Sequence, residues 1–147
     1  MGDFTAQLTL QHEVLDAQHA EIFRRLAAVA EALDGPRAPL EEDLAALADT
    51  LVTHLATEEQ LMDEALYPER GRHKSAHELF MADFVQMRST LRDEGPTPAV
   101  VDWVTRRIPE WLKFHISVND YPLGLFLARR RTLPGGDRPA QGGKRPS

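Results

Sequence analysis

The sequence predicts an all-α protein, an up-down-up-down four-helix bundle with an N-terminal arm. Four segments place apolar residues at alternating steps of three and four, which is the spacing of a helix face that packs against a core. Short breaks separate these segments at Gly35-Pro36, Tyr67-Pro68 and Gly95-Pro96. Short connections place consecutive helices antiparallel. Strands are not expected, because the chain has no sustained alternation of apolar and polar residues and no Asn-Gly turn.

The arm is expected to cover residues 1–15 and to pack Phe4, Leu8 and Leu10 on the bundle. The first helix follows, with Asp16 as its N-terminal cap, and runs to about Asp34. The core-facing residues of this helix are predicted to be Leu15, His19, Ile22, Leu26, Val29 and Leu33.

The second helix is expected to begin at Pro39, with the acids of residues 41–43 near its positive end, and to end near Tyr67-Pro68. Its predicted core-facing residues are Leu40, Leu44, Leu47, Leu51, His54, Glu58 and Leu61. The third helix is expected to run from about Glu69 to Glu94. Its predicted core-facing residues are His73, His77, Phe80, Phe84, Met87 and Leu91.

The fourth helix is expected to be capped by Thr97, with Pro98 in its first turn. Pro109 removes one backbone hydrogen bond and should kink this helix slightly. Its predicted core-facing residues are Val101, Val104, Ile108, Trp111, His115 and Val118. Pro122 and Gly124 predict that the helix is weak beyond Asp120. Residues 1–131 are therefore assigned to the bundle with its arm, and residues 132–147 to a disordered, basic tail rich in glycine and proline.

Composition narrows the class of protein. A chain of 147 residues fits one domain, and without cysteine it has no disulfide and no thiolate metal ligand. We expect no membrane contact, because no apolar run reaches the length of a membrane span. The N-terminus lacks the features of a signal peptide, so a cytoplasmic location is expected. The net charge of −6 argues against a nucleic-acid surface, although the chain from Arg129 onward is basic.

Seven polar residues carry the chemistry that the sequence predicts. They are His19, His54, Glu58, His73, His77, His115 and Asp120. All but the last fall on core-facing positions, where an imidazole or carboxylate needs a partner. A metal is the expected partner, and seven ligands are enough for two ions. Asp120 departs from the pattern, because it lies about 140° around an ideal helix from His115.

Several segments give the chain a resemblance to a known family. These segments are Leu15-Asp16-Ala17-Gln18-His19, His54–Met62, Tyr67-Pro68, His73–His77 and Trp111–Asp120. With them the chain resembles single-domain bacterial hemerythrins over roughly residues 4–128. All seven ligand positions of that family hold the expected type of residue. The chain differs from the relatives at Phe4, where tryptophan is common, and at His12, where an aliphatic residue is common.

The resemblance implies a non-haem di-iron centre. His73, His77 and His115 would hold one iron, and His19 and His54 would hold the other. Glu58 and Asp120 would bridge the two ions beside an oxo or hydroxo bridge, and dioxygen would bind at the open position of the second iron. The residues that would line the oxygen pocket are Ile22, Leu55, Trp111, Leu112 and Ile116. Because all five are apolar, the pocket should be dry, which favours the release of unchanged dioxygen.

The resemblance favours a protein that binds dioxygen reversibly, as a carrier, store or supply, over an enzyme. The alternatives are a di-iron peroxidase, oxidase or nitric oxide reductase, or an oxygen or redox sensor on the same scaffold. Iron storage is disfavoured, because storage sites prefer oxygen ligands. Three roles remain open for His12. It could be a modulator at the pocket mouth, a proton route that promotes autoxidation, or a capping or surface residue, and we favour the last. The sequence does not identify a protein partner.

Overall fold

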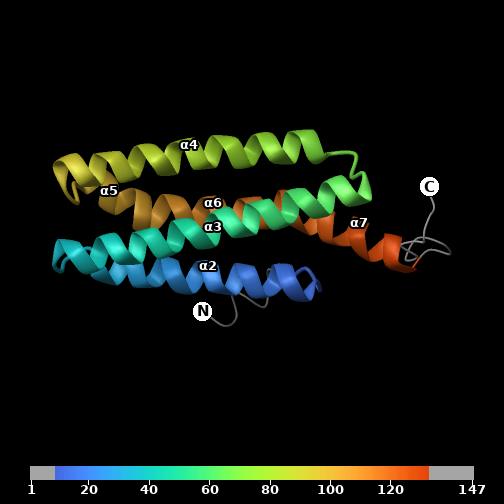
Figure 1. The fold of residues 1–147 in the computed structure, drawn as a ribbon, viewed down its shortest axis with the longest axis horizontal. Coiled ribbons are helices and arrows are strands. Elements are labelled where there is room, and N and C mark those ends of the chain that lie inside the picture. The colour runs from blue at the N-terminus through green and yellow to red at the C-terminus, as the bar shows by residue number, and fades with distance from the viewer. Residues whose placement is uncertain (1–8, 133–147) are drawn as a thin grey trace.

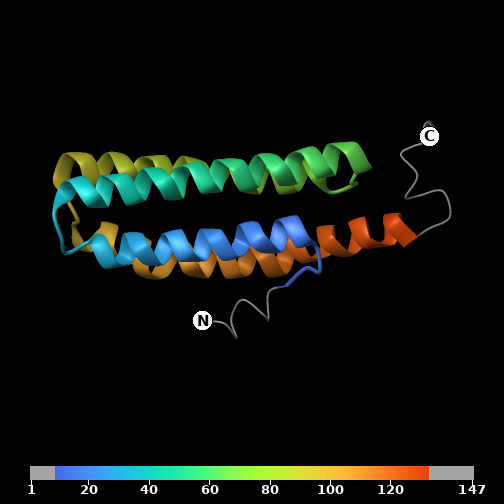
Figure 2. The same cartoon turned by 60° about the horizontal axis from the view of Figure 1, so that its bottom comes forward.

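The computed structural model describes residues 9–132, which form four antiparallel helical rods (Figure 1). The first three rods are α2 (Glu13–Ala32), α3 (Arg37–Ala65) and α4 (Arg70–Glu94). The fourth rod comprises α5 (Pro98–Asp102), η1 (Trp103–Arg107), α6 (Ile108–His115), η2 (Ile116–Asp120) and α7 (Tyr121–Thr132). The described residues contain no strand, and each rod reverses direction relative to the one before it (Figures 1 and 2). The predicted all-α four-helix bundle is confirmed.

The apolar core lies along the inner faces of the rods, largely at the predicted positions. Leu15, Leu47 and Ile108 are each completely buried. Four predicted core residues are not fully buried. Leu61, Val101 and Trp111 are only partly buried, and Met62 takes the core position one turn after Glu58. Val118 is 44% exposed, for a reason that lies in the backbone of the fourth rod.

The start of α2 differs from the prediction, because His12 and not Asp16 is its N-cap. The Nδ1 atom of His12 accepts a hydrogen bond from the backbone N–H of Leu15 at 3.3 Å. Asp16 lies one turn into the helix and accepts hydrogen bonds from the backbone N–H groups of Leu10 and His12. Together these bonds satisfy amide groups that a helix start leaves without partners. They also tie the short segment before α2 to the helix.

The start of α3 is also earlier than predicted. The helix begins at Arg37 with Pro36 as its N-cap, so Pro39 occupies the third helical position. Its first turn contains no acidic residue, and the predicted placement of acids at the positive end is therefore wrong. By contrast, Thr97 caps α5 as predicted, because its hydroxyl accepts a hydrogen bond from Val100 N–H.

Two π-helical segments interrupt the fourth rod, and a proline follows each of them closely. The N–H of Ile108 donates to the carbonyl oxygen of Trp103, and the N–H of Tyr121 donates to that of Ile116, each across five residues. Pro109 and Pro122 have no N–H with which to make the usual bond to the fourth residue before them. A π turn accommodates one residue more than an α turn. The positions that face the core of the bundle therefore shift by one residue at each of the two π segments.

The weak region predicted around Pro122 is wrong, because α7 continues through Pro122 and Gly124 to Thr132. The predicted packing of Phe4 and Leu8 falls outside the described residues. So does the predicted tail from residue 133 onward, and the boundary at residue 131 stays a prediction.

Gly124 is the point at which the chain before α2 touches α7. A Cβ atom there would lie 3.1 Å from Leu10 Cβ and 3.3 Å from the Leu10 carbonyl oxygen. A Cβ atom at Gly71, which lies in α4, would have no atom within 4 Å. Both Gly→Ala changes gain helix propensity, so overpacking should make Gly124→Ala about 1–3 kcal/mol less stable than Gly71→Ala. Urea unfolding measures the difference, and equal stabilities would contradict the contact with Leu10.

Candidate metal centre

All four rods contribute to a buried polar cluster inside the bundle. Its members are His19 from α2, His54 and Glu58 from α3, His73 and His77 from α4, His115 from α6 and Asp120 from η2. None of the seven is more than 3% exposed. The structure therefore brings together every residue that the sequence analysis singled out as a ligand.

The cluster divides into two groups of potential ligand atoms, each lying within 4.8 Å of one another. The first group consists of Glu58, His73, His77, His115 and Asp120. The second group consists of His19, His54, Glu58 and Asp120. Both carboxylates belong to both groups, so they lie between three imidazoles on one side and two on the other.

Each carboxylate directs one oxygen toward each group. Glu58 Oε1 lies 3.1 Å from His77 Nε2, while its Oε2 lies 3.2 Å from His54 Nε2. Asp120 Oδ1 lies 2.9 Å from His73 Nε2, while its Oδ2 lies 3.0 Å from His19 Nε2. This is the arrangement by which a carboxylate bridges two cations.

The π segment η2 explains why Asp120 joins the cluster. On an ideal α-helix, five residues place Asp120 about 140° from His115. Because the π turn takes up one additional residue, the two side chains instead face the same way, as residues one α turn apart do. His115 Nε2 and Asp120 Oδ1 are 3.2 Å apart. The same shift exposes Val118 and buries Asn119, which is 8% exposed.

Hydrogen bonds on the outer side of the cluster hold two imidazoles in the tautomer that a metal requires. His54 Nδ1–H donates to Gln18 Oε1 at 2.8 Å, and His77 Nδ1–H donates to Glu59 Oε2 at 3.0 Å. With the proton on Nδ1, the lone pair of Nε2 points into the cluster. Gln18 is itself held by Thr57, whose hydroxyl accepts from Gln18 Nε2.

His115 has an outer partner of a different kind. The Asn119 amide nitrogen lies 3.0 Å from His115 Nδ1, and Arg72 donates to the Asn119 amide oxygen at 3.3 Å. Coordination through His115 Nε2 requires the Asn119 amide to turn so that its oxygen accepts from Nδ1–H. One face of the His115 imidazole is covered by Trp111, with ring centroids 4.4 Å apart and an angle of 11° between the ring planes.

Without a cation, the carboxylates attract protons to the cluster. Burial lowers the pKa of His54 and of His73, but hydrogen bonds to Asp120 and Glu58 outweigh this effect and raise both pKa values to about 9. Burial and the charge of Asp120 raise the pKa of Glu58, but hydrogen bonds from the histidines lower it to about 2. Burial lowers the pKa of His115 below its usual value. The site therefore favours an ionised Glu58 carboxylate beside positively charged groups, which are protonated histidines when no metal is bound.

The residues fit a metal, because protons alone leave their atoms poorly satisfied. His115 Nε2 lies 3.2 Å from Nε2 of both His73 and His77, although a neutral imidazole carries only one proton. Glu58 Oε2 and Asp120 Oδ1 are buried and have histidine nitrogens at 3.2 Å and 2.9 Å, yet neither oxygen accepts a hydrogen bond of good geometry within the described part of the chain. Buried polar atoms of this kind are uncommon in native proteins. A cation in each group would give these atoms a partner.

The five apolar residues predicted to line an oxygen pocket are buried or partly buried. Ile22 and Ile116 are each 1% exposed, Leu112 is 3% exposed and Leu55 is 7% exposed. Trp111 is partly buried. His12, the predicted candidate modulator, caps α2.

Sequence reasoning missed the outer residues Gln18, Glu59 and Asn119. Gln18 and Glu59 each lie beside a predicted ligand in the sequence, and Asn119 lies four residues after His115. Their signal is that each is a polar residue next to a ligand or one turn from it. Many solvent-exposed positions share that signal, so it does not separate these residues from their neighbours.

The fold and this cluster together define a metal-binding four-helix bundle. Residues 10–123 match the family model of the hemerythrin HHE cation binding domain, and the chain belongs to that family. It is 32% identical to a bacteriohemerythrin of Stenotrophomonas maltophilia (strain R551-3) over 114 residues, which cover 77% of this chain and 72% of the relative.

Two further relatives give the same result. The chain is 30% identical to bacteriohemerythrins of Pseudomonas paraeruginosa (strain DSM 24068 / PA7) and Pseudomonas aeruginosa (strain LESB58). Each alignment covers 74% of this chain and 69% of the relative. No solved structure matches the chain significantly. Among the described residues, no helix combines the length and the apolar character needed to cross a membrane. The resemblance drawn from the sequence is confirmed at the level of the family.

Proposed function

We propose that the protein binds two iron ions and, through them, binds dioxygen reversibly. His73, His77 and His115 would hold one ion, and His19 and His54 the other, while Glu58 and Asp120 bridge them. The observation that supports this proposal best is the division of both carboxylates between the two groups of histidines. Such bridges would hold two ions close together, so that both could supply an electron to one dioxygen molecule.

The ligand set is compatible with iron and disfavours magnesium and calcium. Imidazole suits iron, copper and zinc, whereas magnesium and calcium prefer oxygen ligands, and the chain has no cysteine. Two ferrous ions, two carboxylates and one hydroxide leave a charge of about +1, which tolerates burial far better than bare ions do. When bound, the iron pair would supply the two electrons that dioxygen takes up.

The apolar shell supports reversible binding over oxidase chemistry. Side chains such as Ile22, Leu112 and Ile116 exclude water and offer no group that donates a proton. The residue considered as a proton route, His12, uses its Nδ1 atom to cap α2. No observation in the described part of the chain favours the enzyme or sensor alternatives. A cytoplasmic location belongs to the same proposal.

The proposal is tested by the stoichiometry of oxygen uptake. Anaerobically reduced, iron-loaded protein should take up one dioxygen for every two iron ions, as measured with an oxygen electrode. Flushing with argon should return the same amount of dioxygen. Uptake that cannot be reversed, with peroxide or water as product, would instead assign the site to an oxidase.

Changing Ile116 to asparagine should accelerate autoxidation of the oxygenated protein several-fold. The amide would bring a polar group and water to a position that is now 1% exposed beside His115. Ile116→Val keeps the apolar surface and serves as the matched control. The rate is measured from the decay of the oxygenated absorption band. Equal rates in the two variants would show that the apolar shell does not protect bound dioxygen.

Changing Gln18 to leucine should weaken iron binding at the His19 and His54 position by about 10–100-fold. The change removes the acceptor for His54 Nδ1–H, and outer partners of metal-bound histidines typically contribute this much. Gln60, which is exposed and bonds to Glu64, provides the control variant Gln60→Leu. Competition with a chelator measures the affinity. The same affinity in both variants would mean that Gln18 does not orient His54.

A further inference from the structure

A row of aromatic rings leads from the candidate metal centre to the surface. Trp111 stacks on His115 with ring centroids 4.4 Å apart, and Phe80 stacks on Trp111 at 4.0 Å and 19°. Trp103 continues the row, at 6.0 Å and 20° from Phe80. We name these four residues the aromatic row. It is the only such series of stacked rings among the described residues that ends on a residue of the cluster.

The π segment η1 puts Trp103 in this row. Trp103 and Trp111 are eight residues apart, which places them about 80° apart on an ideal α-helix. Because η1 takes up one additional residue, they behave as residues seven apart, about two full turns, and both face α4. Phe80, which lies on α4 and is 2% exposed, fits between their rings.

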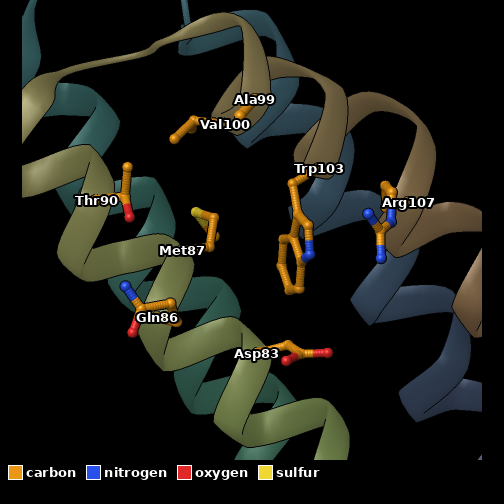
Figure 3. Close-up of a pocket in the computed structure, with 8 residues that line it drawn as sticks. All are labelled: Asp83, Gln86, Met87, Thr90, Ala99, Val100, Trp103 and Arg107. Atoms are coloured by element: carbon orange, nitrogen blue, oxygen red, sulfur yellow. The ribbon is translucent and has the colours of Figure 1, made fainter.

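The outer end of the row opens into a groove between α4 and the start of the fourth rod. The groove has a volume of about 240 Å³. Its lining includes Asp83, Gln86, Thr90, Ala99, Trp103 and Arg107. Figure 3 shows the Trp103 ring in the middle of the groove, with Met87 to one side, Arg107 to the other and Asp83 nearby. One side of the groove is therefore aromatic, and the rim of the groove carries the negative Asp83 and the positive Arg107.

We propose that this groove binds a reduced flavin and that the aromatic row conducts its electrons to the metal centre. The inference rests on the proposed di-iron site, which loses function whenever autoxidation leaves both ions ferric. Stacked rings shorten the through-space gaps that an electron must cross when it tunnels from the groove to His115, and no ring of the row is itself oxidised. Because the rings of the row lie between the surface and His115, an electron crosses several short gaps and not one long gap.

The chemistry of the groove matches this donor. A flavin ring is planar and can stack on Trp103. Reduced flavin is anionic near neutral pH, so Arg107 attracts it, and the Asp83 carboxylate can accept a hydrogen bond from a ring N–H. At about 240 Å³ the groove is smaller than most ligand pockets, so it would hold the flavin ring and leave the rest of the molecule in solvent.

The electron balance closes without another reactant. One reduced flavin loses two electrons and becomes oxidised flavin, and its protons pass to solvent or buffer. The two electrons would pass singly along the row, and each would reduce one ferric ion held by the proposed ligands. No atom is transferred, and no bond to the protein forms or breaks.

Stopped-flow reduction tests the proposal. Diferric, iron-loaded protein is mixed without oxygen with photoreduced flavin mononucleotide, and the loss of ferric absorbance is followed. Trp103→Leu should lower the second-order rate constant at least tenfold, because it breaks the row and removes the stacking surface. Dithionite, which is small and does not stack, should reduce Trp103→Leu and the unchanged protein equally fast. Phe114→Leu is the matched control, because Phe114 is 61% exposed, adjoins His115 in the sequence and lies outside the row.

A second variant leaves the row intact. Ala99 is exposed and lines the groove, so Ala99→Met should obstruct it and slow reduction by flavin, but not by dithionite. Binding of flavin mononucleotide, measured by quenching of its fluorescence, should weaken in Trp103→Leu and in Ala99→Met and stay unchanged in Phe114→Leu. Unchanged flavin rates in both groove variants would overturn the inference. If Trp103→Leu loses iron, the rate of reduction of Ala99→Met by flavin tests the inference without it. Iron content is measured on each sample, so failure to hold two ions would refute the proposed function separately.

Discussion

A chain carrying His54→Ala is expected to hold one iron ion where the unchanged chain holds two. His54 is one of only two imidazoles in its group, whereas the other group has three. Without it, His19 and two shared carboxylate oxygens remain, which is too few ligands to hold the second ion. Metal analysis of purified protein measures the stoichiometry, and reversible oxygen binding should disappear with the lost ion.

The control for this experiment is His12→Ala. His12 is the one histidine of the six in the chain that lies outside the cluster, and its Nδ1 atom caps α2. This variant should keep two ions and lose only about 1 kcal/mol of stability with its cap. An unchanged iron count in His54→Ala would refute the assignment of ligands, whatever the effect on stability.

Removing the metal is expected to lower the melting temperature by about 8–16 °C. A ligand present at a thousand times its dissociation constant stabilises the folded state by about 4 kcal/mol, and in a chain of this size each kcal/mol shifts the midpoint by about 2–4 °C. The buried carboxylates and imidazoles lose their partner when the metal leaves. Calorimetry before and after treatment with a chelator measures the change.

The metal-free protein should also acquire a distinctive dependence of stability on pH. The pKa of His54 and of His73 rises from 6.5 to about 9 in the folded state, so their contribution is complete below pH 6.5 and is lost as the pH rises through 9. The pKa of Glu58 falls from 4.5 to about 2, so its contribution is present above pH 4.5 and is lost as the pH falls toward 2. Stability should therefore be greatest between pH 4.5 and 6.5.

The loaded protein should behave differently on the alkaline side. A metal ion takes the place of the proton on Nε2 of His54 and of His73, so stability should not fall between pH 6.5 and 9. Acid should release the metal, because protons compete for the imidazoles. Melting temperatures of both forms across this range provide the comparison. Identical pH profiles for the two forms would contradict a metal centre at these residues.

The sequence predicted the fold and six of the seven clustered residues for one physical reason. A helix face toward a core repeats every three or four residues, and His54, Glu58 and His77 occupy positions at which leucine is usual. The pattern depends only on α-helical geometry. It therefore placed the ligands of α2, α3 and α4 correctly, because the backbone is α-helical there.

The pattern failed where the backbone departs from that geometry. Asp120 converges on His115 only because η2 contains one additional residue per turn, and the same segment turns Val118 outward. Pro109 and Pro122 are visible in the sequence, but a proline predicts a kink as readily as a π turn. The starts of α2 and α3 were missed because His12 is an unusual cap and because Pro36 caps α3 without a side-chain hydrogen bond.

The optical spectrum of the iron-loaded protein distinguishes reversible dioxygen binding from irreversible oxidation. The spectrum is recorded after anaerobic reduction, after addition of dioxygen and after its removal. Reversible binding at a di-iron centre predicts charge-transfer bands that appear with dioxygen, vanish when it is removed and return in further cycles. Bands that decay to a stable diferric spectrum in the first cycle would contradict reversible binding. The absence of bands from protein that holds two iron ions would contradict the site itself.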